Sequence, residues 1–302
     1  MAISAKEIMN EIASHSEYLH VVDGEEKCQL QRTLVGMMED IHRMCVDNHI
    51  RYSLFGGSAL GAYRHQGFIP WDDDIDIVMP RREWERFKAL FEKNLGADYI
   101  LEAPNYGNKD TKTTWGKVYK RGAELVEIQD LNTPFCNGIF VDVFILENVS
   151  DNIFIRNVDA KLSDFLKGVA TSQLYYLYPN DLLWKFYGAS KESLRYFKMR
   201  RFLGFLFSWI SHKRFCELYD RFVSRHSDDL PLWTVPTSRN NYKGETMPKS
   251  WFDPLKLMKF EDKEFYVFNN ITEYLEHMYG KNYMQLPPEE KRERHFCVRI
   301  KF

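Results

Sequence analysis

The sequence lacks several features that mark common classes of protein. None of its 302 residues belong to an apolar run of about 18, and the first residues have no apolar core of the kind that a signal peptide needs. We therefore expect no membrane-spanning helix. The five cysteines are widely spaced, without a CxxC pair or a neighbouring histidine, which leaves no pattern for a zinc site and predicts a reduced, cytoplasmic setting.

Net charge is also nearly absent. Forty-one basic residues stand against forty-three acidic ones, which gives a formal charge of -2. Such a chain has no overall field that attracts nucleic acid, so we expect no nucleic acid partner. The hydrophobic fraction of 44% is large enough for a substantial core and excludes a disordered chain.

Hydrophobic periodicity predicts an α+β fold. The spacing of apolar residues indicates a helix over residues 29–48, and short strands are indicated at 51–55, 74–78 and 138–146. The order of these elements is uneven, which favours a mixed β-sheet core with flanking helices over a doubly wound parallel sheet. Long helical patterns then continue to about residue 227, as expected for a helical insertion or subdomain.

A glycine turn follows the strand at 51–55. Gly56, Gly57 and Ser58 precede a helical pattern, with Ser58 predicted near its N-cap. Backbone amides at a helix N-terminus, a hydroxyl and the close approach that glycines permit are suited to phosphate oxygens. Because Gly-Gly-Ser occurs in many ordinary turns, its meaning depends on its position sixteen residues before Asp74.

Four aspartates lie between positions 72 and 76, and Asp74 and Asp76 alternate with isoleucines. In a strand, this period of two would place both carboxylates on one face. Two charges about 7 Å apart repel by roughly 2 kcal/mol at an effective dielectric constant near 20, so the cluster requires a positive partner. Hard oxygen ligands suit Mg²⁺ or Mn²⁺, whereas the alternative is a solvated acidic turn.

Asp142 interrupts the apolar strand at 138–146, where an unpaired carboxylate would be costly. An arginine or a backbone amide would satisfy it, and so would a metal ion shared with Asp74 and Asp76. With an Asp-x-Asp pattern earlier in the same core, we favour the shared metal.

The segments 56–65, 67–76 and 138–144 together resemble the signature of the LicD family. The tail at 279–288, followed by a basic group that includes His295, resembles the C-terminal signature of the same family. The resemblance covers most of the chain, apart from the helical middle.

This resemblance implies a nucleotidyltransferase-type fold with its catalytic core in residues 1–150. A helical insertion would span 151–230, and 231–302 would pack back on the core. The family often has Phe-Pro-Leu-Asp where this chain has residues 144–147, so the role of Glu147 is open.

The activity that the resemblance implies is metal-dependent transfer of a phospho-alcohol group from a nucleotide-activated donor. The typical reaction moves phosphocholine from CDP-choline, or another CDP-alcohol, to a sugar hydroxyl of a glycan or lipid-linked glycan precursor of the teichoic acid or lipopolysaccharide type. Fukutin-type relatives transfer ribitol phosphate instead.

Under this hypothesis Asp74, Asp76 and Asp142 hold the metal, and Asp142 also accepts the proton of the attacking hydroxyl. Gly56, Gly57 and Ser58 would bind phosphate oxygens.

Three basic residues complete the expected site. Arg64 or His65 would neutralise charge on the leaving CMP, with a salt bridge from Arg64 to Asp72 and Asp73 as an equal alternative. His295 would contact phosphate, unless it is an ordinary surface histidine.

Two further segments have open interpretations. Residues 198–214 are apolar between basic clusters, which fits either a buried helix or peripheral contact with an anionic membrane. The aromatic stretch 175–187 fits either core packing or a cage for a quaternary ammonium.

Two other functions remain as alternatives. A nucleotidyltransferase that attaches a nucleotide to a small molecule would use the same metal ligands but release pyrophosphate. A binding module without activity is the third hypothesis, although all three carboxylates are present.

Overall fold

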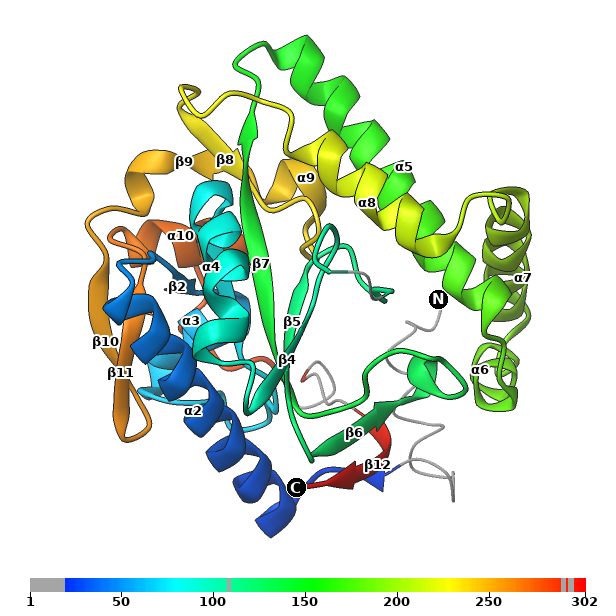
Figure 1. Ribbon diagram of the computed structural model, residues 1–302, viewed down its shortest axis with the longest axis horizontal. Coiled ribbons are helices and arrows are strands. Elements are labelled where there is room, and N and C mark those ends of the chain that lie inside the picture. The colour runs from blue at the N-terminus through cyan, green and yellow to red at the C-terminus, as the bar shows by residue number, and fades with distance from the viewer. Residues whose placement is uncertain (1–19, 108–109, 289–291, 293–295) are drawn as a thin grey trace.

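A curved, seven-stranded sheet forms the centre of the protein, which we describe from a computed structural model (Figure 1). The structure describes residues 20–107, 110–288, 292 and 296–302. The main path of the sheet has the order β2-β3-β7-β5-β4, and β8 and β9 extend it from the far end of β7. Only the β3–β7 pair on this path is parallel. The strands are β2 (Ser53–Leu54), β3 (Asp76–Pro80), β4 (Tyr99–Glu102), β5 (Gly116–Lys120), β7 (Phe140–Val149), β8 (Leu232–Thr234) and β9 (Met247–Pro248).

Two smaller sheets flank this centre. β10 (Lys256–Phe260) and β11 (Lys263–Val267) form a hairpin. The other sheet has the order β1-β12-β6. The last strand of the described chain, β12, therefore lies between the first strand, β1, and β6. Its strands are β1 (His20–Val21), β6 (Glu124–Glu127) and β12 (Phe296–Lys301).

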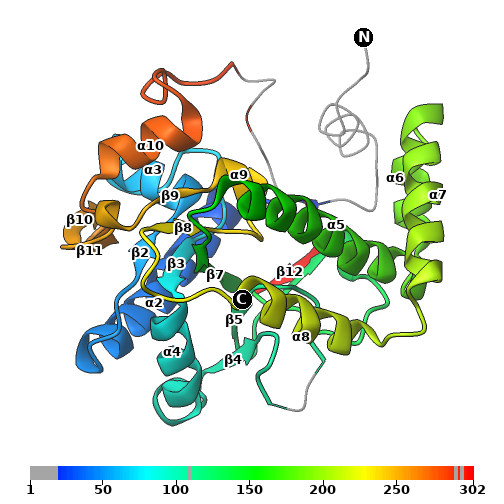
Figure 2. The same ribbon diagram turned by 90° about the horizontal axis from the view of Figure 1, so that it is seen from above.

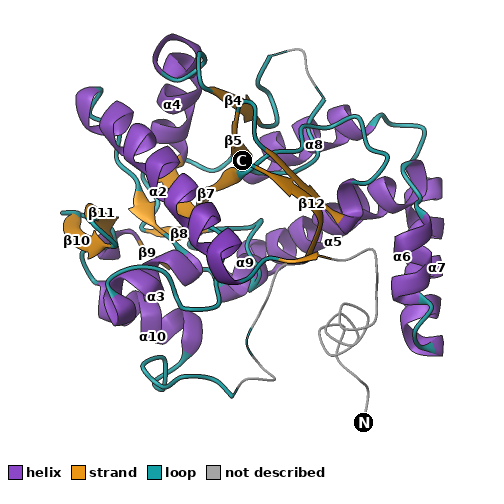
Figure 3. Ribbon diagram, turned by 90° about the horizontal axis from the view of Figure 1, so that it is seen from below, coloured by secondary structure: helices purple, strands orange, loops and turns teal. Residues whose placement is uncertain are grey.

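The helices divide between two sides of the molecule. Figure 1 shows α2, α3, α4 and α10 on the side of β2 and β3, and Figure 2 shows α5, α7 and α8 on the opposite side. In Figure 3, α6 and α7 lie side by side at the outer edge. The helices are α2 (Gly24–Asp47), α3 (Gly56–His65), α4 (Arg81–Asn94), α5 (Ile153–Leu177), α6 (Asp181–Tyr187), α7 (Lys191–Leu206), α8 (His212–Val223), α9 (Asn241–Gly244) and α10 (Ile271–Tyr279).

The largest hydrophobic core lies between the sheet and the helices of the first group. The buried face of α2 shows why this sequence is helical here, since its apolar residues recur every three or four positions. Those that are buried are Leu30, Leu34, Val35, Met37, Met38, Ile41, Met44 and Cys45.

The predicted α+β class is confirmed, although the predicted bounds differ from the observed ones: the first helix begins at Gly24, and β2 and β7 are shifted or shortened by a few residues. Two differences concern the site. The strand predicted at 74–78 begins at Asp76, because its pairing with β7 begins there, and Asp74 lies in the preceding loop. The helix predicted to start near Ser58 begins at Gly56. The division into a core, a helical part and a C-terminal part stays a prediction. Within the described ranges, no helix is both long and apolar enough to cross a membrane.

Candidate active site

The glycine turn at the start of α3 lies against two carboxylates. Gly56 has a φ of +53°, a left-handed conformation that favours glycine, and a Cβ there would lie 3.4 Å from Asp76 Oδ2. A Cβ on Gly57 would lie 2.9 Å from Asp72 Oδ2. The two glycines therefore leave room for these carboxylates beside the first amides of a helix, which have no intrahelical acceptor.

Ser58 connects this turn to strand β3. Phe55 is the N-cap, so Ser58 is the third residue of the helix rather than its cap. Its Oγ accepts a hydrogen bond from the Asp76 amide at 2.9 Å, and the Gly56 amide donates to the Tyr274 hydroxyl at 2.9 Å. In this structure the Ser58 oxygen and the Gly56 amide thus have partners within the protein, and their contacts with phosphate stay predictions.

Asp76 and Asp142 are direct neighbours on parallel strands. The register of β3 and β7 pairs these two residues, and the Asp142 amide donates to the Ile75 carbonyl at 3.1 Å. Side chains of directly paired residues lie on the same face of a sheet, about 5 Å apart. The fold therefore brings together two carboxylates that are far apart in the sequence.

Two residues that sequence reasoning missed contact Asp142. The Trp115 indole Nε1 donates to Asp142 Oδ1 at 2.7 Å, and Lys117 Nζ lies 2.9 Å from the same oxygen. Lys117 comes from the neighbouring strand β5, where it is paired with Asp142, and its ammonium lies 3.2 Å from the centre of the Phe140 ring. The spacing of two between Trp115 and Lys117 was the available signal, since it places both on one face of a strand.

The three aspartates at the adjoining ends of β3 and β7 are of a chemical type that binds divalent cations. Carboxylate oxygens from Asp74, Asp76 and Asp142 are the hard ligands that Mg²⁺ prefers. As the side chains stand, no three metal-binding groups converge within the part of the chain that the structure describes, and Lys117 supplies the positive charge beside Asp142. The metal assignment therefore stays a prediction based on ligand chemistry and strand register.

The glycine turn opens into a cavity of about 620 Å³, which we call the turn cavity. Asp72, Asp74 and Asp76 line one part of it, and the loop between β8 and α9 lines another. That loop contributes Arg239, which sequence reasoning also missed because no motif marks it. The cavity thus combines helix-terminal amides, carboxylates and arginine, as a site for a metal-bound diphosphate would require.

Arg64 lines the turn cavity, whereas His65 supports it from outside. Arg64 donates to the Tyr283 carbonyl at 2.6 Å and, through Nε, to His65 Nε2 at 2.9 Å. Burial, and then the positive charge of Arg64, lower the pKa of His65, so the imidazole is neutral at pH 7 and accepts this bond. The predicted role of Arg64 toward the leaving group remains a prediction. His65 is placed to orient Arg64.

A second cavity of about 360 Å³ lies on the side of β7 that faces α5, and we call it the aromatic cavity. Trp115, Phe140 and Tyr175 are among its lining residues. Asp142 lines only this cavity, Asp76 lines only the turn cavity, and Asp74 lines both. The carboxylates therefore separate two spaces of different character.

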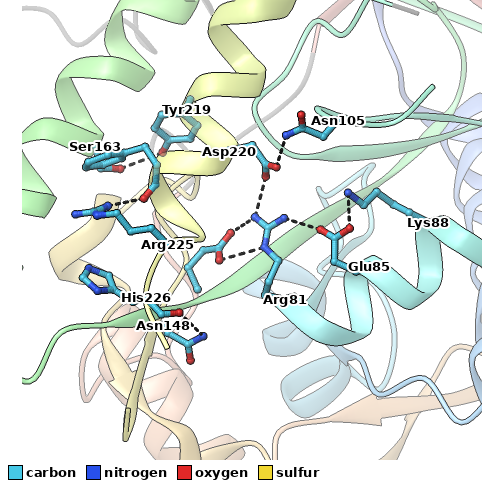
Figure 4. Close-up of polar contacts among 12 residues, drawn as sticks. Arg81, Glu85, Lys88, Asn105, Asn148, Ser163, Tyr219, Asp220, Arg225 and His226 are labelled. Atoms are coloured by element: carbon cyan, nitrogen blue, oxygen red, sulfur yellow. Dashed lines mark hydrogen bonds and ion pairs between the residues drawn. The ribbon is translucent and has the colours of Figure 1, made fainter. Parts of the chain in front are cut away.

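Glu147, whose role the sequence left open, belongs to a buried ion-pair cluster at the other end of β7. It is 1% exposed and pairs with Arg81 at the start of α4. Figure 4 shows Arg81 pointing also toward Asp220 of α8, at 2.8 Å, where Asn105 donates to the same carboxylate at 2.7 Å. This cluster joins α8 to α4 and β7, so Glu147 has a structural role.

The aromatic stretch 175–187 packs largely within the protein. The rings of Tyr187, Trp184 and Tyr175 lie 4.5, 5.0 and 5.4 Å from the ring of Phe197, which is fully buried. This arrangement favours core packing over a choline cage for these rings.

The segment 198–214 is only partly buried: Leu203, Phe207 and Ile210 pack against a small core formed with α5 and α8, whereas five other large apolar side chains are exposed. The exposed ones are Met199, Phe202, Phe205, Leu206 and Trp209.

His295, the remaining predicted site residue, lies outside the described residues.

Comparisons with known proteins agree with this arrangement. The family described as LicD/FKTN/FKRP, nucleotidyltransferase domain, matches residues 49–165, which include the glycine turn, the aspartate cluster and Asp142. The lipopolysaccharide cholinephosphotransferase LicD of Haemophilus influenzae is 26% identical over 273 residues, covering 88% of this chain and 94% of the relative.

Two shorter matches are uncharacterized proteins from Rickettsia. One, from Rickettsia typhi, is 39% identical over 66 residues, which cover 21% of each chain. The other, from Rickettsia prowazekii, is 49% identical over 45 residues, which cover 15% of this chain and 17% of the relative. Residues 49–165 therefore match the LicD-type nucleotidyltransferase domain, and together with the near full-length relative this match supports a phosphotransferase.

Proposed function

We propose that this enzyme transfers phosphocholine from CDP-choline to a sugar hydroxyl of a cell-surface glycan precursor, of the lipopolysaccharide or teichoic acid type. The observation that carries this proposal is the pairing of Asp76 with Asp142 beside a glycine turn that opens into a cavity of about 620 Å³. Support for the substrate class comes from the near full-length relative, which is a lipopolysaccharide cholinephosphotransferase.

In the proposed reaction, the bond between the choline phosphate and CMP breaks while a new P–O bond forms to the sugar oxygen. The proton of the sugar hydroxyl passes to the Asp142 carboxylate, which Trp115 and Lys117 hold in a fixed orientation. The Gly57 amide and Arg64 bind the phosphate oxygens of the donor, and Arg64 stabilises the negative charge on departing CMP.

We propose Asp74, Asp76 and Asp142 as ligands of Mg²⁺ or Mn²⁺. When bound, the metal would neutralise the negative charge of the diphosphate. Hard carboxylate ligands from two adjacent strands support this choice.

The direct test is incubation of the purified enzyme with Mg²⁺ and CDP-choline, CDP-ethanolamine, CDP-glycerol or CDP-ribitol, with and without sugar acceptors. We expect CMP from CDP-choline, in amounts that rise when an acceptor is added. Failure of all four donors, together with pyrophosphate release from CTP, would favour nucleotide transfer instead.

We also propose that the enzyme works in the cytoplasm and docks on the inner membrane face through residues 198–214, near lipid-linked acceptors. Trp209 is 78% exposed and Phe202 is 61% exposed. Lys198, Lys213 and Arg214 lie along the same segment, and this combination of basic and exposed apolar side chains is complementary to an anionic interface.

Co-sedimentation with vesicles tests this docking. The wild type should bind vesicles that contain anionic phosphatidylglycerol more strongly than neutral phosphatidylcholine vesicles. The double variant Phe202→Ser/Trp209→Ser should lose most of the binding, whereas Leu257→Ser, which removes an exposed side chain on β10, should not. Equal binding by all three proteins would contradict the assignment of this segment.

A further inference from the structure

The aromatic cavity has no role in binding the donor as described above. It lies across the carboxylates from the glycine turn, and Asp74 is the lining residue that it shares with the turn cavity. In-line displacement at phosphorus brings the attacking oxygen from the side opposite the leaving group. A donor held at the glycine turn therefore leaves the aromatic cavity as the side from which an acceptor can approach.

One aspartate that lines this cavity has a buried carboxylate oxygen without a hydrogen-bond donor among the described residues. Asp130 lines the cavity and is 2% exposed, and its Oδ2 is 2.6 Å from Lys112 Nζ. Its Oδ1 is buried and lacks a partner within the described ranges. Because leaving such an atom unsatisfied costs about 1–3 kcal/mol, the site favours a ligand that donates a hydrogen bond there.

The walls of the cavity suit a neutral, partly apolar ligand. Trp115, Phe140 and Tyr175 contribute aromatic rings to these walls. The Trp115 ring is stacked on Phe144 of the turn cavity at a centroid distance of 5.8 Å, and Phe140 lies under the Lys117 ammonium. Lys112 and Lys117 are paired with Asp130 and Asp142 respectively, so their charges are compensated within the protein. Aromatic walls with a few fixed polar groups match the carbon face and the hydroxyls of a sugar ring.

We propose that the aromatic cavity is the binding site for the acceptor saccharide. One sugar hydroxyl donates to Asp130 Oδ1, and the hydroxyl that attacks phosphorus lies at Asp142. This inference rests on the proposed transfer to a sugar, and it assigns donor and acceptor to opposite sides of the carboxylates.

Thr171 provides a way to close the cavity without disturbing the core, because this α5 residue lines the cavity and its side chain is exposed. The variant Thr171→Trp places a large ring in that space. Leu162→Trp on the same helix is the matched control, since Leu162 is 40% exposed and lines neither cavity. Asp130→Asn tests the proposed hydroxyl acceptor with little change in size.

The probes are methyl β-galactoside and methyl N-acetyl-β-glucosaminide, and binding is followed without donor by saturation-transfer NMR. We expect signals from at least one glycoside with the wild type and Leu162→Trp. The signals should be lost with Thr171→Trp. In Asp130→Asn the affinity for the glycoside should fall about 10-fold, as expected for loss of a charged hydrogen bond. No glycoside signal with the wild type, or equal signals with Thr171→Trp, would overturn the assignment.

A parallel assay without acceptor follows CMP formed by slow hydrolysis of CDP-choline. Leu162→Trp should hydrolyse CDP-choline at the wild-type rate, whereas in Thr171→Trp the KM for a glycoside acceptor should rise about 10-fold or more. If Thr171→Trp abolishes glycoside binding but none of the proteins forms CMP, the saccharide site is supported and the proposed donor is rejected. If the wild type forms CMP and the acceptor KM of Thr171→Trp is unchanged, the saccharide site is rejected and the proposed donor is supported.

Discussion

Asp76 and Asp142 are 66 positions apart in the sequence and are paired directly across the only parallel strand pair on the main path of the sheet. Strand β3 delivers Asp76 beside the glycine turn, and Ser58 bonds to the Asp76 amide. Strand β7 delivers Asp142 to the edge of the aromatic cavity. The pair therefore links the two cavities, and the predictions below depend on this arrangement.

Metal binding should depend on both members of this pair. Asp76→Asn and Asp142→Asn each remove a charged oxygen ligand, so we expect Mn²⁺ affinity to fall about 10-fold or more in each. Electron paramagnetic resonance titration of free Mn²⁺ measures this directly. Asp262→Asn is the control, because Asp262 is highly exposed and lies in the β10–β11 turn. Unchanged Mn²⁺ affinity in both strand variants would contradict the ligand assignment.

Lys117 should stabilise the protein through Asp142. Both side chains are nearly buried, so Lys117→Met leaves a buried carboxylate without its cation and should lower the free energy of unfolding by about 3 kcal/mol. Because a cation at Asp142 can replace the lost charge, Mg²⁺ should restore part of this stability. Urea unfolding with and without Mg²⁺ tests both points.

Lys120→Gln on the same strand provides the comparison for Lys117→Met, because Lys120 is only partly buried. It should change stability little and show no larger Mg²⁺ effect than the wild type. Equal free energies of unfolding in the two variants would show that the Lys117–Asp142 ion pair does not stabilise the protein as proposed.

The glycine at position 57 should matter for activity more than for folding. In Gly57→Ala the new Cβ would meet the Asp72 carboxylate, the flexible end of a side chain that can shift at small cost. We expect stability within about 0.5 kcal/mol of the wild type but at least about 10-fold slower CMP release, because the methyl group blocks phosphate approach. Gly36→Ala in α2, where a Cβ meets no atom within 4 Å, should retain activity. Full activity in Gly57→Ala would exclude close approach of the donor to this turn.

Glu245 should make stability depend on pH. It is fully buried beside the loop that carries Arg239, and burial raises its pKa to about 7 from an ordinary value of 4.5. Between these two pH values the folded protein binds a proton that the unfolded chain has released. The stabilisation from this group is therefore complete below pH 4.5 and is lost as the pH rises to 7, by up to about 3 kcal/mol.

Glu245→Gln can still accept from Ser238 and Asn240 but does not titrate. Urea unfolding at pH 5 and pH 8 should therefore show a larger loss of stability in the wild type than in this variant. Parallel changes in the two proteins would show that Glu245 does not titrate in this range.

The sequence predicted those parts of the fold that depend on local patterns. The amphipathic α2, the strand carrying Asp142 and the glycine turn all have signals within a few residues. The bounds of β3 were wrong because pairing with β7, rather than alternation of side chains, determines where a strand begins. Sheet β1-β12-β6 was not predicted, since its short strands exist only through pairing between distant segments.

The site residues also divide into those with a local sequence signal and those recognised only in the folded structure. Asp74, Asp76 and Asp142 stand out in the sequence as charges within apolar surroundings, and that signal needs no knowledge of the fold. Arg239 carries no such signal, and Trp115 has only its spacing of two from Lys117. An indole donor and a loop arginine gain their meaning from what they face.

The central claim is phosphocholine transfer at the carboxylates of β3 and β7. Its most direct measurement is Mg²⁺-dependent release of CMP from CDP-choline by the wild type and by Asp142→Asn, with thermal unfolding as a check that both are folded. We predict CMP release by the wild type and a loss of at least about 100-fold in Asp142→Asn. Release at similar rates by the two folded proteins would contradict the account.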